Sequence, residues 1–217
     1  MVFLARCGAQ PHHQLIPVPT QVNWQYRPVM RGEGGRGKGL KQMYVYCMFC
    51  ETQRCKVIAK LMEIRGALRS FSPQIVRRQR KKGVNREVQF DLLPGYVFVF
   101  SEERMVDYTQ FFGMDGVIRR VGKQDTGYEL AGSDLDFAMK LFEKDGLVGS
   151  MKTCSIGDEV TLEDPLFNGC QGKITRIDWR KERARVDFVF DNMACHTWIS
   201  IDGVKSQKKD KDPLSET

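Results

Sequence analysis

The cysteines are the first residues of this chain whose type and spacing could carry chemistry. Cys47 and Cys50 form a C-x-x-C pair and Cys55 follows five residues later, a spacing that could hold zinc. Within a strand, however, Cys47 and Cys50 would point to opposite faces, and the chain has no matching second pair. Cys195 and His196 could act as nucleophile and base, but adjacent strand residues also point apart. We therefore expect packed thiols, with no metal and no catalytic site.

Basic residues are the second chemical feature. A group without any acid among its members lies in one short segment: Arg77, Arg78, Arg80, Lys81, Lys82 and Arg86. Like charges so close repel unless a polyanion neutralises them, so this group predicts contact with nucleic-acid phosphates. The alternative is a solvated tip that touches another protein or nothing. A second group is interspersed with acids and is more typical of a solvated surface, with room for a weaker RNA contact: Lys173, Arg176, Arg180, Lys181, Arg183 and Arg185.

Composition agrees with a basic globular protein of two small domains or one large one. The chain has 217 residues, a formal net charge of +7, a pI near 9.1 and 41% hydrophobic residues. Such a charge favours polyanions. Seven cysteines is an odd count, and no secretory signal precedes them, so reduced thiols and a cytoplasmic location are expected. No glycine-rich phosphate loop or useful carboxylate pair suggests an enzyme or a cofactor.

The elements that must position these residues fall into two regions. Residues 43–144 predict an α+β layer, with an antiparallel sheet and flanking helices. Its expected elements, in chain order, are strand 44–50, helix 52–65, a strand around 71–78, strand 87–92, the central strand 96–100, a short helix 105–112, strand 117–121 and a helix opened by Ser133. The basic group would lie on a long hairpin.

The second region predicts a small barrel. Residues 145–153 carry glycines and no pattern, as in an interdomain linker. Residues 154–205 contain short strands at near-regular spacing, expected at 159–163, 172–178, 185–190 and 197–201, as in a small closed all-β barrel. Residues 1–42 predict a disordered leader, and Met43 could be the natural start. Residues 206–217 form a charged tail.

Two motifs in succession resemble one family. The run Leu93-Pro94-Gly95-Tyr96-Val97-Phe98-Val99, followed by Gly116–Gly122, is similar to the amino-terminal (NGN) domain of NusG transcription factors. Residues 156–162, then 167–174, then Ile177-Asp178 look like the KOW motif of an SH3-like barrel, with Gly169, Gly172 and Lys173 at motif positions. The resemblance covers residues 44–204 in the family's order. Within the family the chain is most similar to specialised LoaP-type paralogues, through Phe49–Thr52 and Arg80–Val84.

The resemblance implies a non-enzymatic elongation or antitermination factor, expected as a monomer. The amino-terminal domain would bind the clamp region of RNA polymerase through an apolar patch at Phe49, Leu93 and Tyr96. The alternative is that all three are core residues. The basic group would contact an RNA hairpin or the non-template DNA strand. The alternative is a KOW-type RNA-binding protein associated with the ribosome, for which the barrel alone suffices.

Three departures from the family's pattern bear on the partners. Gln53–Lys56 replaces glycine followed by acids at the helix entry, so the surface expected near the nucleic acid is more basic than is usual in the family. Pro165-Leu166-Phe167 replaces Gly-Pro-Phe. Asp191-Asn192 follows Phe190 where Gly-Arg is common. This departure bears on whether the barrel binds the family's usual barrel partners, the termination factor Rho and a ribosomal protein.

Overall fold

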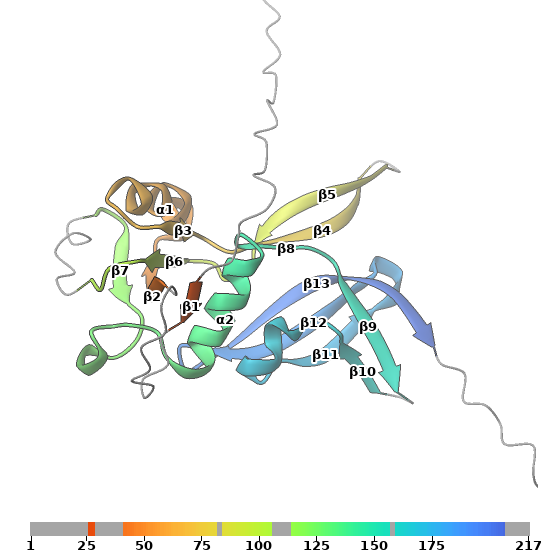
Figure 1. The fold of residues 1–217 in the computed structure, drawn as a ribbon. Coiled ribbons are helices and arrows are strands. Elements are labelled where there is room, and N and C mark those ends of the chain that lie inside the picture. Colours follow the sequence, from red (N-terminus) through yellow and green to blue (C-terminus); the bar gives the residue numbers. More distant parts are fainter. Residues whose placement is uncertain (1–25, 29–40, 82–83, 106–113, 157–158, 207–217) are drawn as a thin grey trace, which may run out of the picture.

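A central sheet with a helix on each face forms the amino-terminal part of the molecule (Figure 1). The computed structural model describes residues 26–28, 41–81, 84–105, 114–156 and 159–206. The strands of this sheet run in the order β1 (Tyr26–Pro28), β2 (Lys41–Cys50), β6 (Tyr96–Ser101) and β3 (Arg69–Phe71), and β7 (Val117–Arg120) also pairs with β2. Within residues 1–42, the predicted leader, the structure describes residues 26–28 and 41–42, and both segments belong to strands.

Strand β2 is buried on both faces, as its unbroken apolar sequence predicts. Met43, Val45 and Cys47 enter one hydrophobic cluster, while Met48 and Cys50 enter the other. Strand β6 is buried along its whole length and lies between β2 and β3, which confirms the prediction of a central strand.

Each face of the sheet is covered by an amphipathic helix. Helix α1 (Cys55–Ile64), preceded by the 3-10 turn η1 (Thr52–Arg54), buries Cys55, Ile58 and Met62 against one cluster. Helix α2 (Gly132–Glu143), preceded by η3 (Gln124–Thr126), covers the other face. The expected helix 105–112 lies almost wholly outside the described residues.

The basic residues lie on a hairpin of a separate sheet, made by β4 (Gln74–Lys81), β5 (Val84–Asp91) and β8 (Leu147–Val148) in the order β5-β4-β8. The prediction of one strand over 71–78 was wrong: β3 ends before Ser72-Pro73, and β4 pairs with other strands. Pro73 explains the break, since proline has no backbone N–H for a ladder. The segment expected as a linker contains β8, which pairs in parallel with β4 and buries Val148.

The carboxy-terminal barrel is a nearly closed five-stranded sheet. Its strands are β9 (Met151–Ile156), β10 (Glu159–Leu162), β11 (Lys173–Asp178), β12 (Arg183–Phe190) and β13 (Met193–Ser206), with 3-10 turns η4 (Pro165–Cys170) and η5 (Trp179–Lys181). They run in the order β10-β9-β13-β12-β11. The four predicted strands are present, and β9 completes the sheet. Hereafter "the barrel" means β9 to β13, and "the amino-terminal unit" means β2 to α2.

One hydrophobic core joins the two parts. A single cluster of buried residues contains Phe98 and Phe137 of the amino-terminal unit together with Phe167, Phe188 and Phe190 of the barrel. The barrel therefore packs on the α2 face of the sheet, as Figure 1 shows.

Candidate protein-binding face and nucleic-acid interface

The turn between β5 and β6 brings two of the predicted contact residues together. Phe49 and Tyr96 are cross-strand partners on β2 and β6, with ring centroids 5.1 Å apart. Gly95, at φ +89, lets the chain pass beneath them: an added Cβ would lie 2.7 Å from Phe49 Cε2, and the Cys50 amide donates to the Gly95 carbonyl. Only glycine fits this turn without strain. Leu93 is buried in the cluster that also holds Tyr96.

The barrel covers this aromatic pair. Tyr96 is only 4% exposed, and the ring of Phe190 meets it edge-on at 5.3 Å and packs at 5.4 Å from Phe98. Phe49 remains half-buried. Tyr96 is therefore sealed in part by a side chain of the barrel and not only by its own unit. We call Phe49, Leu93 and Tyr96 the aromatic face.

Phe137 of α2 is the hub of the contact between the two parts. Its ring centroid lies 6.5 Å from that of Phe98 in the sheet, and 5.6 Å and 5.7 Å from those of Phe188 and Phe190 in the barrel. Phe167 of η4 completes the group at 6.1 Å. Tilted aromatic pairs at these separations stabilise beyond their area of burial, by about 0.5–1.5 kcal/mol each.

Polar contacts surround the aromatic hub. Asp191, at the tip of the β12–β13 hairpin, forms an ion pair with Arg119 of β7, and this raises the pKa of the guanidinium. Arg119 also lies over the ring of Phe49, 5.4 Å from its centroid. The Asp191 amide donates to Asp134 of α2 at 3.2 Å, although burial raises the pKa of that carboxyl. The hairpin tip is thus held by both α2 and β7.

A second polar seam lies between α2 and η4. The Lys144 ammonium pairs with Asp164 at 2.8 Å, and Lys140 Nζ donates to the Pro165 carbonyl at 2.7 Å. Asp164 also caps η4 by accepting from the Leu166 amide. These contacts fix the end of the barrel that carries Phe167 and Leu166 against the helix.

Two polar atoms at the junction are left without partners. The Tyr96 hydroxyl and Arg77 Nε are buried and have no hydrogen bond among the described residues. Burial raises the pKa of Tyr96 to about 12 and lowers that of Arg77. A buried unsatisfied hydroxyl costs roughly 1–3 kcal/mol, so the closed arrangement carries a penalty that separation of the two parts would relieve.

The predicted nucleic-acid-binding residues of the hairpin lie in different surroundings. Arg77 and Arg78 face the barrel: Arg77 donates to Thr197 at 3.3 Å, and Arg78 pairs with Asp202 at 3.0 Å and Glu182 at 3.6 Å. Arg86 is exposed. Arg80 and Lys81 belong to β4 but their side chains, like the whole of Lys82, lie outside the described part.

The cysteines are packed where the sequence predicts. Cys47 and Cys50 belong to separate clusters on opposite faces of β2, which confirms their predicted orientation. Burial raises the pKa of Cys50 to about 12 and that of Cys47 well above its usual range, so both thiols stay protonated near neutral pH. Cys195 is half-buried and its pKa is also raised, while His196 is exposed. Within the described ranges, no group of histidine, cysteine and carboxylate side chains could hold a metal ion.

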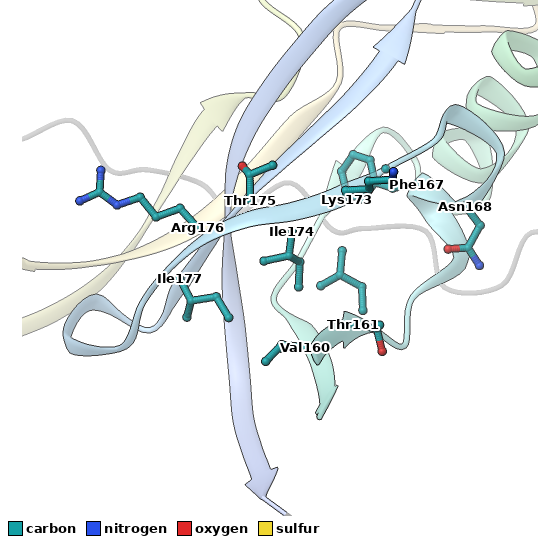
Figure 2. Close-up of a pocket in the computed structure, with 11 residues that line it drawn as sticks. Val160, Thr161, Phe167, Asn168, Lys173, Ile174, Thr175, Arg176 and Ile177 are labelled. Atoms are coloured by element: carbon teal, nitrogen blue, oxygen red, sulfur yellow. The ribbon is translucent and has the colours of Figure 1, made fainter. Parts of the chain in front are cut away.

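A groove of about 690 Å³ runs between β10 and β11 (Figure 2). Two motif residues, Gly172 and Lys173, line it, and a Cβ on Gly172 would lie 2.3 Å from Phe167 Cβ. Gly169 lies beside Asp136 of α2. Gly172 therefore allows close packing of η4, whereas a Cβ on Gly169 would lie 3.6 Å from Asp136 Cβ, an ordinary contact distance. The described residues that line it include Lys173, Thr161 and Thr175 but no carboxylate, imidazole or thiol.

Comparisons with known proteins give a likeness in structure but none in sequence. No protein-family model matches the sequence, and no curated protein matches it. Among solved structures, one described as "Domain interaction in Thermotoga maritima NusG" is similar at 15% identity, with a TM-score of 0.44, over 73% of this chain and 93% of that chain. A similarity of this size does not define a family. Separately, no helix in the described ranges has the length and apolar character to cross a bilayer.

Proposed function

We propose that this chain is a NusG-type transcription elongation or antitermination factor without catalytic activity. Its amino-terminal unit (the NGN domain of the sequence resemblance) binds the clamp region of RNA polymerase through the aromatic face, and its basic residues bind nucleic acid, so that pausing or termination is suppressed. The barrel corresponds to the KOW domain. The protein acts as a cytoplasmic monomer of the specialised LoaP type.

The observation that supports this proposal is the nature of the aromatic face. Phe49 and Tyr96 lie together at the ends of two central strands, beside Arg119, and the Tyr96 hydroxyl has no hydrogen-bond partner among the residues that the structure describes. Aromatic rings with an unsatisfied polar tip suit a protein interface, where the tip finds a partner or water. A face that served only as permanent core would not need a buried hydroxyl there.

Binding of polymerase to this face requires that the barrel move away, because Phe190 occupies it in the structure. The barrel then becomes free for partners of its own. The family resemblance implies Rho or a ribosomal protein as the partner of the barrel. Asp191-Asn192, where Gly-Arg is common in the family, is the departure that bears on this binding.

The test is co-purification with core RNA polymerase and run-off transcription through a terminator. Because Tyr96 also holds the barrel, its role is measured in a background already opened by Phe190→Asp. Replacing Tyr96 by alanine there should weaken polymerase binding about tenfold or more, as for aromatic residues at the centre of interfaces, and should reduce readthrough. Circular dichroism must show that the variant is folded. Sedimentation with ribosomes and no binding to polymerase would instead support the ribosome-associated alternative.

The hairpin is tested by removing the three charges nearest its tip. In Arg80→Gln/Lys81→Gln/Lys82→Gln, affinity for RNA and DNA should fall, and the slope of log affinity against log salt should become shallower by about 2, since each neutralised phosphate contributes about 0.7–0.9. The control Lys60→Gln/Arg65→Gln/Lys123→Gln removes equal charge from exposed positions elsewhere. An unchanged slope in the hairpin variant would remove the hairpin from the proposed function.

A further inference from the structure

An exposed tryptophan stands in the turn between β11 and β12. Trp179 opens η5 and is 54% exposed, among the most exposed large apolar side chains of the described residues. Arg180 and Lys181 follow it directly, and both are exposed. The turn therefore presents a flat aromatic ring directly beside two positive charges, the two kinds of group that bind single-stranded nucleic acid.

The backbone of this turn is firmly held. Asp178 caps it by accepting from the Lys181 amide at 3.2 Å, and Glu182, in the left-handed conformation at φ +47, donates its amide to the Trp179 carbonyl. The Glu182 carbonyl accepts from the Ile201 amide of β13 at 2.9 Å. Trp179, Arg180 and Lys181 are therefore presented by an ordered turn, which lowers the entropy lost when a ligand binds.

The carboxylates around the turn are already neutralised. Asp178 pairs with Arg183 at 3.2 Å, and Glu182 pairs with Arg78. No carboxylate of the described residues lies within ion-pair distance of Arg180 or Lys181. These two charges are consequently free for an anion. Arg176 on β11, which also lines the groove of Figure 2, adds a third exposed cation near the same end of the barrel.

The turn also adjoins the basic hairpin. The Arg78–Glu182 pair, at 3.6 Å, and the Arg78–Asp202 pair hold β4 against the barrel beside η5. A nucleic-acid strand bound at the turn would therefore reach the basic hairpin next. Phosphates need cations along their path and unpaired bases need a flat ring, and this surface offers both.

We infer that Trp179, Arg180 and Lys181 form a binding site for single-stranded nucleic acid, with one base stacked on the indole and adjacent phosphates on the two cations. The site lies on the barrel, apart from the aromatic face. It rests only on the nucleic-acid part of the proposed function and requires no polymerase.

Fluorescence anisotropy with labelled unstructured oligo(U) and oligo(dT) tests the site on the full chain without polymerase. Trp179→Ala should lose about tenfold or more in affinity for both strands, because stacking on an aromatic ring is a large and sugar-tolerant part of such binding. Trp179→Phe should keep most of it. A duplex of equal length should bind less tightly than the single strands, since its bases are already stacked.

The cationic half has its own measurement. Arg180→Gln/Lys181→Gln should make the salt slope shallower by about 1.4, since each phosphate on a single strand contributes about 0.7. Lys60→Gln/Lys123→Gln removes the same charge from exposed positions of the amino-terminal unit and should leave the slope unchanged. Wild-type affinity in Trp179→Ala, or equal loss in the control pair, would overturn the site. If Trp179→Ala and Arg180→Gln/Lys181→Gln keep oligonucleotide binding but lose polymerase binding, the turn contacts protein and not nucleic acid.

Discussion

Replacing Phe190 by aspartate is expected to strengthen binding to RNA polymerase by about tenfold or more. Phe190 closes the aromatic face through its contacts with Tyr96 and Phe98, and a charge there has no partner in the apolar cluster. If only the open arrangement binds polymerase, apparent affinity rises in proportion to the open fraction. The gain stops when nearly all molecules are open. Binding to immobilised core polymerase measures it.

The control for this experiment is the adjacent residue. Val189→Asp introduces the same charge into the same strand, but Val189 faces outward and is 36% exposed. It should leave polymerase affinity unchanged. If both variants bind as the unmodified protein does, then the barrel does not compete for the aromatic face. If both gain equally, the effect belongs to loss of the barrel fold and not to the contact at Tyr96.

Truncating Phe137 to alanine is expected to lower the free energy of unfolding by about 3–5 kcal/mol, the usual cost for a fully buried phenylalanine. Its ring packs against Phe98 of the sheet and against three barrel side chains, Phe167, Phe188 and Phe190. The same substitution should therefore also uncouple the amino-terminal unit from the barrel. Chemical unfolding followed by circular dichroism and by tryptophan fluorescence should then give two separate transitions in place of one.

Phe100→Ala distinguishes uncoupling from simple loss of stability. Phe100 is as fully buried as Phe137, but its ring partners, Phe71 and Phe142, both belong to the amino-terminal unit. Its removal should cost a similar free energy while the barrel keeps its contact with α2. Coincident transitions in Phe137→Ala would show that other contacts join the two parts.

The sequence was sufficient for the buried strands and the main helices. The unbroken apolar runs of β2 and β6 predict strands covered on both faces, and the structure confirms this. The spacing of Cys55, Ile58, Leu61 and Met62 predicts the buried side of α1. The structure buries the other three but leaves Leu61 37% exposed, so the prediction was wrong for Leu61. The break before β4 was missed although Pro73 signals it, because the apolar residues on either side suggest one continuous strand.

The closed junction could not be predicted from local pattern. Val186, Phe188 and Phe190 alternate along β12, and this pattern is fully accounted for by a barrel interior. That the last of them reaches into another unit depends on how the two parts dock. Likewise, the run of basic residues in β4 gives no sign that Arg77 and Arg78 turn toward the barrel, since pairing with Asp202 joins positions far apart in the chain.

The short connection between β8 and β9 sets how strongly the barrel competes for the aromatic face. Only Gly149 and Ser150 separate these strands, so the two surfaces cannot diffuse far apart. Such a tether gives an effective local concentration of about millimolar order. A docking affinity far too weak to join two separate proteins would therefore still keep most molecules shut. Polymerase must therefore compete with the tethered barrel for the aromatic face. The barrel is displaced most readily where polymerase is itself held close to the protein.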